Sequence, residues 1–320
     1  MTPWGNGQLF RLGLAAVALM MMAGLSLIIG VGELSESREA AWRLLVLSRV
    51  PRTIALILAG ASMAVSGLLM QMMVRNRFVE PSTAGTVESA GLGMVCLTLG
   101  APGLSIWART LLTALFAMAG TALFLRILKA VPVRSALIVP LIGIALSGII
   151  HAASAFLAYR YDLLQSLNAW LLGDFSTVLK GRYEILYLSF ALTALAYFAA
   201  DRFTVAGLGP GMSANLGLDY ERVLRFGIII VSAVSATVVT TVGVIPFLGL
   251  VVPNLVSLVM GDNARRSIPW IALVGADLVL VCDIFGRLVN YPFEVPIGTV
   301  LGIVGSALFL GLLLKREGVE

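Results

Sequence analysis

Charged residues are scarce in this 320-residue sequence, and their scarcity excludes most classes of soluble protein. Asp, Glu, Lys and Arg make up 12% of the chain, whereas hydrophobic residues make up 59%, and the mean hydropathy is +0.98. Soluble domains carry about 25% charged residues, so a chain this poor in charge cannot cover a surface that faces water. The composition therefore predicts an integral membrane protein.

Residues for metal binding and catalysis are equally few. Cys96 and Cys282 lie far apart in apolar stretches, and His151 is the only histidine, so neither a disulfide nor a metal site is expected. The sequence has no GxxxxGK[ST] phosphate-binding loop and no convincing set of nucleophile, base and orienting residue. An intramembrane enzyme is therefore disfavoured, no cofactor is expected, and the chain itself is not expected to bind ATP through such a loop.

Long polar stretches are also absent, so we expect one membrane domain over residues 1–320 rather than a separate soluble domain. Apolar runs of ~20 residues suit helices that cross a membrane, and the sequence predicts an all-α fold with about ten. They are residues 12–31, 53–73, 83–100, 107–128, 137–158, 184–200, 223–243, 247–260, 268–285 and 297–314. The eighth is short and holds Pro253, which favours a position inside the bundle, where neighbouring protein satisfies the freed backbone groups.

The distribution of Lys and Arg predicts the orientation. Ten spans put both termini on one side, and if that side is the cytoplasm, thirteen of the 22 basic residues fall at inner breaks and nine at outer breaks. Basic residues accumulate in cytoplasmic loops, so both termini are expected in the cytoplasm. The net charge of +5 is then explained by span ends, and nucleic-acid binding is not expected.

Two segments between spans are unusually long. Within residues 159–183, five leucines between 163 and 172 fall on one helical stripe beside aromatic residues, which predicts an amphipathic helix on the outer membrane surface. Residues 201–222 are Gly-rich with a short helical piece near residues 212–216, on the cytoplasmic side. Within the second span, Gly60, Ala64 and Gly67 share much of one face, which favours close helix packing.

Carboxylates in or near apolar runs leave an alternative open. A buried carboxylate marks either a transport pathway or a structural pair, and Glu88 and Asp277 are the candidates. A proton- or sodium-coupled secondary transporter could use them together with His151. A structural or partly solvated role is the simpler interpretation.

Six motifs resemble a known family. They are "RVPRTIALILAGASMAVSGLLMQ" at 49–71, "RNRFVEPSTAG" at 75–85, "LGPGMSANLGLDYERV" at 208–223, "GVIPFLGLVVPNLV" at 243–256, "LVLVCDIFGRL" at 278–288 and "EVPIGTVLGIVGSALFLGLLLK" at 294–315. The chain resembles FecCD-type permeases, the membrane subunits of ATP-driven importers for ferric siderophores, haem and cobalamin. The resemblance implies the ten-helix fold of the vitamin B12 importer permease, a cell inner membrane location and no enzymatic activity.

The same resemblance implies partners and a substrate. Two permease subunits, identical or related, would work with two cytoplasmic ABC ATPases and a periplasmic or lipid-anchored binding protein. Most members have "RNPLA-P" where residues 76–81 read "NRFVEP", and "VPH" where residues 252–254 read "VPN". The "NRFVEPSTAGTVE" version resembles the branch for iron–siderophore complexes, often of the catecholate type, whereas haem or cobalamin remains the alternative.

Three groups of residues are expected to carry function. The resemblance implies that Arg49, Arg52 and Arg287 meet acidic residues on the binding protein. ATPase coupling is expected at Gly207, Leu208, Gly211, Met212, Ser213, Asn215, Leu216 and Gly217. The cytoplasmic corner of the pathway is expected at Arg75, Asn76, Arg77, Glu80 and Pro81, as a tight intracellular turn between two packed helices.

Overall fold

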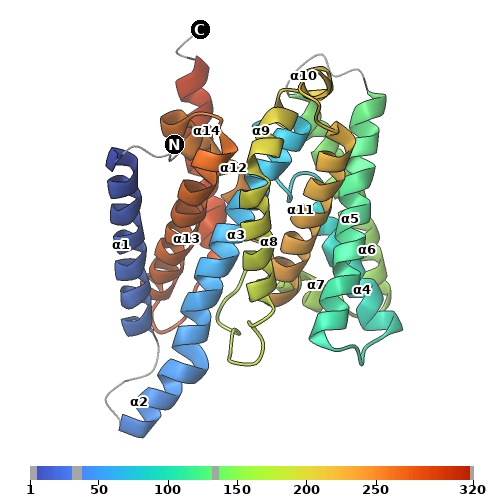
Figure 1. Ribbon diagram of the computed structural model, residues 1–320. Coiled ribbons are helices and arrows are strands. Elements are labelled where there is room, and N and C mark those ends of the chain that lie inside the picture. Colours follow the sequence, from blue (N-terminus) through green and yellow to red (C-terminus); the bar gives the residue numbers. More distant parts are fainter. Residues whose placement is uncertain (1–5, 31–37, 132–136, 318–320) are drawn as a thin grey trace.

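The structure, a computed structural model, describes residues 6–30, 38–131 and 137–317, which form helices and no strand. The helices are α1 (Asn6–Ile28), α2 (Arg38–Leu44), the π-helix η1 (Leu45–Arg49), α3 (Val50–Val74), α4 (Thr86–Gly100), α5 (Ile106–Ala130), α6 (Ile138–Arg160), α7 (Leu164–Leu171), α8 (Leu186–Phe198), α9 (Ala200–Gly207), α10 (Pro210–Asn215), α11 (Tyr220–Val242), α12 (Leu248–Met260), α13 (Ala264–Val289) and α14 (Ile297–Glu317). They form one bundle (Figure 1).

The predicted spans correspond to helices of this bundle. Within the described residues, seven helical runs are long and apolar enough to cross a membrane, and α4, α8 and α12 are shorter apolar helices. Each of the ten predicted segments overlaps one of these helices. The all-helical prediction is therefore confirmed, and the short eighth segment, α12, is largely buried as expected.

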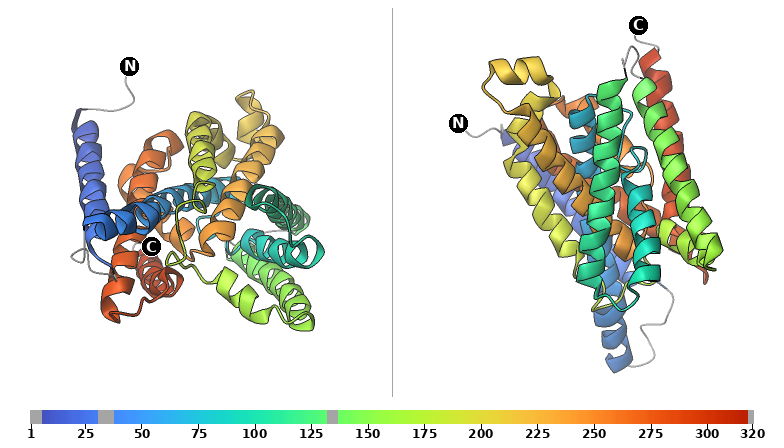
Figure 2. Two further views of the ribbon diagram at one scale, coloured as in Figure 1. Left: turned by 90° about the horizontal axis from the view of Figure 1, so that it is seen from below. Right: turned by 90° about the vertical axis from the view of Figure 1, so that its right-hand side faces the viewer.

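The two ends of the bundle are distinct (Figures 1 and 2). One end, the α10 end, holds α10, the start of α1 and the end of α14. The other, the α2 end, holds α2, α7 and the connections that follow α4 and α13. The first and last described helices thus begin and finish on the same side, as an even number of spans requires.

The second predicted span begins earlier than the sequence indicated. Helical structure is continuous from Arg38 to Val74, because Pro51 sits at the start of α3 and the turn before it widens into the π-helix η1. Proline cannot donate to the carbonyl four residues earlier, and that carbonyl, of Leu47, accepts from the main-chain amide of Lys180 at 3.1 Å instead. The proline therefore does not end the helix.

Helix α3 is the centre of the bundle, and 83% of the residues in an apolar stretch of the helical run Ala41–Val74 are buried. The expected close packing is confirmed at two glycines. A Cβ on Gly60 would lie 2.8 Å from the main-chain oxygen of Gly275 on α13, and one on Gly67 would lie 2.0 Å from that of Gly249 on α12. Only glycine permits backbones to approach this closely.

Helices α4 and α12 are too short to cross a hydrocarbon core of ~30 Å, since 15 and 13 residues span roughly 22 and 20 Å. Helix α4 runs to the α2 end and α12 to the α10 end (Figure 1). Their first residues, Thr86 and Leu248, are fully buried. Both helices therefore begin inside the bundle.

Residues 75–85, here called the corner segment, connect α3 to this buried start of α4. The middle of this segment is buried, because Val79 and Ala84 are fully buried and Glu80 is 3% exposed. Its role as the cytoplasmic corner of a pathway stays a prediction. The segment enters the bundle since α4 is too short to start at the membrane surface.

Candidate functional site

The residues expected to couple to an ATPase lie at the α10 end. Gly209 (φ 102°) precedes α10 and Gly217 (φ 72°) follows it, and both adopt left-handed backbone that favours glycine. Leu218 N–H donates to the oxygen of Ser213 at 2.8 Å, which closes the helix. The Ser213 hydroxyl is buried and donates to the oxygens of Gly209 at 2.8 Å and Val205 at 3.3 Å.

The outer face of this element is apolar. Leu208, Met212 and Leu216, spaced four residues apart, are 61%, 51% and 61% exposed. Helix α10, which they flank or belong to, lies at the end of the bundle rather than on its sides (Figure 1). Large apolar side chains gathered at a polar end are typical of an interaction surface.

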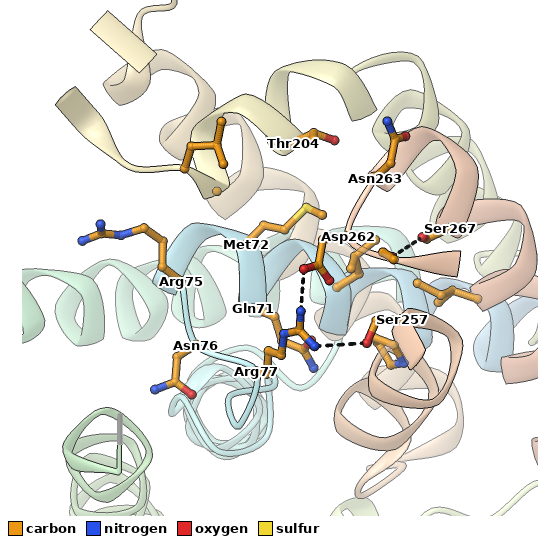
Figure 3. A pocket seen from close by; sticks show the side chains of 16 residues that line it. Gln71, Met72, Arg75, Asn76, Arg77, Thr204, Ser257, Asp262, Asn263 and Ser267 are labelled. Atoms are coloured by element: carbon orange, nitrogen blue, oxygen red, sulfur yellow. Dashed lines mark hydrogen bonds and ion pairs between the residues drawn. The ribbon is translucent and has the colours of Figure 1, made fainter. Parts of the chain in front are cut away.

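A cavity of about 390 Å³ lies beside this element. Figure 3 shows it between the end of α3, the corner segment and the join of α12 to α13. The Arg77 guanidinium donates to the Asp262 carboxylate at 2.5 Å and to the Ser257 hydroxyl at 3.4 Å. Gly207 and Leu208 also line the cavity, so the expected coupling and corner residues meet at one place.

Arg75 links the corner segment to the turn before α10. It ends α3 in a left-handed conformation (φ 52°), and its neighbour Asn76 donates from its main-chain amide to the oxygen of Gln71 at 3.0 Å. A Cβ on Gly209 would lie 2.8 Å from the Arg75 guanidinium. The guanidinium of Arg75 therefore lies against Gly209.

Glu80 is the deepest charged residue of the corner segment. Its Oε1 accepts from the main-chain amide of Phe247 at 3.0 Å and from the Ser82 hydroxyl. The carboxyl group thus lies at the buried N-terminus of α12, where the helix dipole favours an acidic group.

The arginines expected to meet a binding protein lie at the α2 end and are held inside the chain. Arg49 (6% exposed) donates to the oxygens of Leu27 and Ile28, both at 2.9 Å. Arg287 (3% exposed) donates to the oxygens of Ser26, at 3.0 Å, and Ile29. Both therefore bind the carbonyl end of α1.

Two carboxylates complete this cluster. Arg52 contacts Asp283 and Glu294, each at 2.7 Å, and Asp283 also pairs with Arg287. Sequence reasoning missed these acids, although Asp283 precedes Arg287 by four residues, a spacing that pairs side chains on a helix. Arg49 and Arg287 are buried because they donate to the carbonyl groups at the end of α1, which lack partners within that helix. Binding of a partner by these arginines stays a prediction.

The predicted surface helix exists as α7. Leu167 is fully buried against Val95 of α4 and Ala158 of α6, whereas Leu164 and Leu172 are 39% and 41% exposed. The leucine stripe thus packs partly onto the bundle at the α2 end (Figure 1). Its position at an outer membrane surface stays a prediction.

The residues considered for a secondary transporter are not brought together. His151 is exposed on α6, whereas one carboxylate oxygen of Glu88 on α4 and one of Asp277 on α13 are buried without a hydrogen-bond partner. Among the described residues, no cluster of His, Cys, Asp and Glu could hold a metal ion. Within the part of the chain that the structure describes, no chain of hydrogen bonds connects these three residues.

Comparisons with known proteins agree on a family. The model of the FecCD transport family matches residues 9–315. The chain is 45% identical to the petrobactin import system permease protein YclN of Bacillus subtilis, over 94% of this chain and 97% of the relative. It is 40% identical to the ferric-anguibactin transport system permease protein FatD of Vibrio anguillarum, over 93% and 97%.

Two further comparisons extend the range. The vitamin B12 import system permease protein BtuC of Yersinia pseudotuberculosis is 31% identical, over 89% of this chain and 85% of the relative. A solved structure described as an inward-facing conformation of an ABC transporter of the metal-chelate type superposes with a TM-score of 0.81 at 25% identity. That match covers 95% of this chain and 99% of the other.

Proposed function

We propose that this chain, which belongs to the FecCD transport family, is the permease subunit of an ATP-driven importer for a ferric siderophore. The observation that carries the substrate class is the difference in identity between relatives. Identity is 45% and 40% to permeases named for petrobactin and ferric anguibactin, but 31% to one named for vitamin B12. A catecholate-type siderophore is the specific candidate, in line with the "NRFVEPSTAGTVE" motif.

The chain acts in this proposal as a single permease domain, residues 1–320, in the bacterial cytoplasmic membrane. It pairs with a second permease subunit, and two separate ATPase subunits bind at the α10 end, which faces the cytoplasm. The excess of Lys and Arg at the breaks on that side supports this orientation. A binding protein delivers the ferric siderophore to the α2 end.

Residues 207–217 are the docking element for the ATPase in this proposal. The exposed Leu208, Met212 and Leu216 support it, because an apolar helix face suits a groove on a partner. Replacing residues 211–215 by a flexible Gly/Ser segment should leave the permease in the membrane but separate ATP hydrolysis from import. Normal import by this variant would contradict the assignment.

Arg52 is the rim charge best placed to meet an acidic binding protein. Its side chain is 13% exposed, and its partner Glu294 is 22% exposed, so an acidic residue of the partner could replace Glu294. Arg49 and Arg287 then act behind it as support. Arg52→Gln should weaken binding of the partner and Glu294→Gln should strengthen it, since a free guanidinium attracts an acid more strongly. Glu184→Gln, a change at another acid of the same end, serves as the control.

The central experiment is uptake of radioactive iron by vesicles that hold the permeases, the ATPase and the binding protein co-purified from their native membrane. Ferric siderophore should enter only with ATP, and a proton ionophore should not stop it. Uptake driven by a proton or sodium gradient without ATP would contradict the proposal and favour a secondary transporter. Preferential uptake of haem or cobalamin would keep the importer and change its substrate.

A further inference from the structure

Three hydrogen bonds join α12 to α3 and the corner segment across long stretches of sequence. Phe247 N–H donates to Glu80 Oε1 at 3.0 Å, Asn254 Nδ2 donates to the main-chain oxygen of Arg77 at 2.8 Å, and Gln71 Nε2 donates to that of Gly249 at 3.1 Å. Glu80, Gln71 and Asn254 are 3%, 7% and 7% exposed. Buried polar contacts resist separation, because each parted group would lack a partner.

The contact at Gly249 has a specific cause. Pro253 lies inside α12 and cannot donate to the oxygen of Gly249 four residues earlier. Gln71 of α3 satisfies that oxygen, and the close approach of Gly67 to Gly249 brings the two helices near enough. Helix α12 therefore depends on α3 for a bond that an unbroken helix would make itself.

Glu80 binds the N-terminal end of α12 through the main-chain amide of Phe247. Phe247 directly precedes α12 as its N-cap and has φ 62°. This left-handed conformation is unfavourable for a bulky aromatic residue and persists only when its surroundings hold it. The bond from its amide to Glu80 is one such constraint. Gly305 of α14 is the other, because a Cβ there would lie 2.6 Å from the Cβ of Phe247.

The joined elements contact α14. Besides Phe247 against Gly305, the ring of Phe78 in the corner segment meets that of Phe309 edge to face, with centroids 6.1 Å apart. At its first residue, Arg75, the corner segment contacts Gly209 of the docking element, residues 207–217. The corner segment thus touches both the turn before α10 and the face of α14.

We propose that Glu80 is a positioning residue of the transport cycle. Its hydrogen bond makes the corner segment and α12 move as one unit between the docking element, residues 207–217, and α14. Displacement of α10 would pass through Arg75 to the corner segment, and through the bond of Glu80 to Phe247 it would reach the buried start of α12. Packed elements move as rigid bodies when their contacts are too stiff to slide. This inference rests on the proposed function, since it assumes that an ATPase displaces α10.

The test measures the amount of substrate imported per ATP hydrolysed by the complete complex in vesicles. Glu80→Ala should lower this ratio by about ten-fold, because the unpaired amide of Phe247 frees α12 from the corner segment. ATP hydrolysis stimulated by the binding protein should persist in every Glu80→Ala complex that still assembles. Glu80→Gln keeps an oxygen that can accept from Phe247 and should restore most of the import per ATP.

Glu88→Ala is the matched control, because Glu88 is a half-buried carboxyl of the adjoining helix α4 and its buried oxygen has no hydrogen-bond partner. An equal loss in Glu88→Ala would overturn the inference, and so would unchanged import per ATP in Glu80→Ala. If the Glu80→Ala complex fails to assemble, Glu80→Asp is the second test. Its shorter side chain keeps a carboxylate but does not reach the amide of Phe247. Unchanged import per ATP in Glu80→Asp would then overturn the inference.

The proposed function is judged separately in the same vesicles. A wild-type complex that imports no ferric siderophore would contradict that function. A wild-type complex that imports normally, beside an equally efficient Glu80→Ala variant, would contradict only the role of Glu80.

Discussion

Ion pairs at the two ends of the bundle differ in burial. At the α10 end, every side chain in the pairs Arg77–Asp262, Lys129–Glu221, Arg222–Asp219 and Arg265–Asp201 is between 39% and 79% exposed. At the α2 end, Asp283 is 2% exposed and its partners Arg52 and Arg287 are 13% and 3% exposed. Exposed pairs add little stability, whereas a buried pair that loses one member leaves an uncompensated charge. Breaking an ion pair at the α10 end therefore costs little free energy, whereas breaking one at the α2 end costs much more.

The peripheral position of α1 explains why buried charge gathers at the α2 end. Only 6% of the most apolar window of α1 is buried, so packing holds this helix weakly. The last carbonyls of a helix lack partners within it, and Arg49 and Arg287 supply those partners from η1 and α13. The acids of the cluster then balance the arginines that this attachment brings inside.

The largest effect is expected from Asp283→Ala, which leaves Arg52 and Arg287 without their shared carboxylate. Breaking a buried pair by removing one partner is destabilising by about 3–5 kcal/mol. The variant should unfold well below the wild-type temperature when the detergent-solubilised protein is followed by tryptophan fluorescence. Wild-type stability would mean that water reaches this cluster and that the contrast between the two ends is wrong.

A smaller effect is expected from Arg287→Lys, which keeps the charge but loses the planar fork that reaches Ser26, Ile29 and Asp283 together. The loss of hydrogen bonds to these buried groups should lower the free energy of unfolding by about 1–3 kcal/mol. The end of α1 should also become accessible, so a cysteine at Ile28 should react faster with a thiol reagent in this variant. Arg265→Lys, at an exposed pair of the α10 end, is the control and should leave that rate unchanged.

The sequence alone predicts the positions of the apolar spans better than the direction of their charged side chains. Span length is set by membrane thickness, so hydropathy locates α3 or α11 without knowledge of neighbours. Whether Arg287 faces a partner or the carbonyls of Ser26 depends on where α1 packs, and no local pattern contains that information. The burial of Glu80 cannot be predicted locally for the same reason, because the donor that makes this burial possible lies at Phe247.

At the α10 end, Asp262→Ala should have a modest effect on stability. Arg77 is 39% exposed and Asp262 69% exposed, and exposed pairs contribute roughly 0.2–1 kcal/mol. Arg77 also retains the Ser257 hydroxyl as an acceptor. A loss as large as that in Asp283→Ala, measured by the same unfolding assay, would show that the cavity beside Arg77 is closed to water and would remove the difference between the two ends.

The smallest effect is expected for Lys129 and Glu221, which join α5 to α11 at 2.7 Å with 57% and 56% of their side chains exposed. A double-mutant cycle with Lys129→Ala and Glu221→Ala isolates their interaction from other effects of each change. The coupling should lie below about 1 kcal/mol and should fall toward zero as salt is raised, because ions screen exposed charges over about 10 Å at 0.1 M. The same cycle on Arg52 and Asp283 should give a larger coupling that salt hardly changes. Equal salt dependence of the two couplings would mean that solvent screens both ends alike, and burial would then not be what separates them.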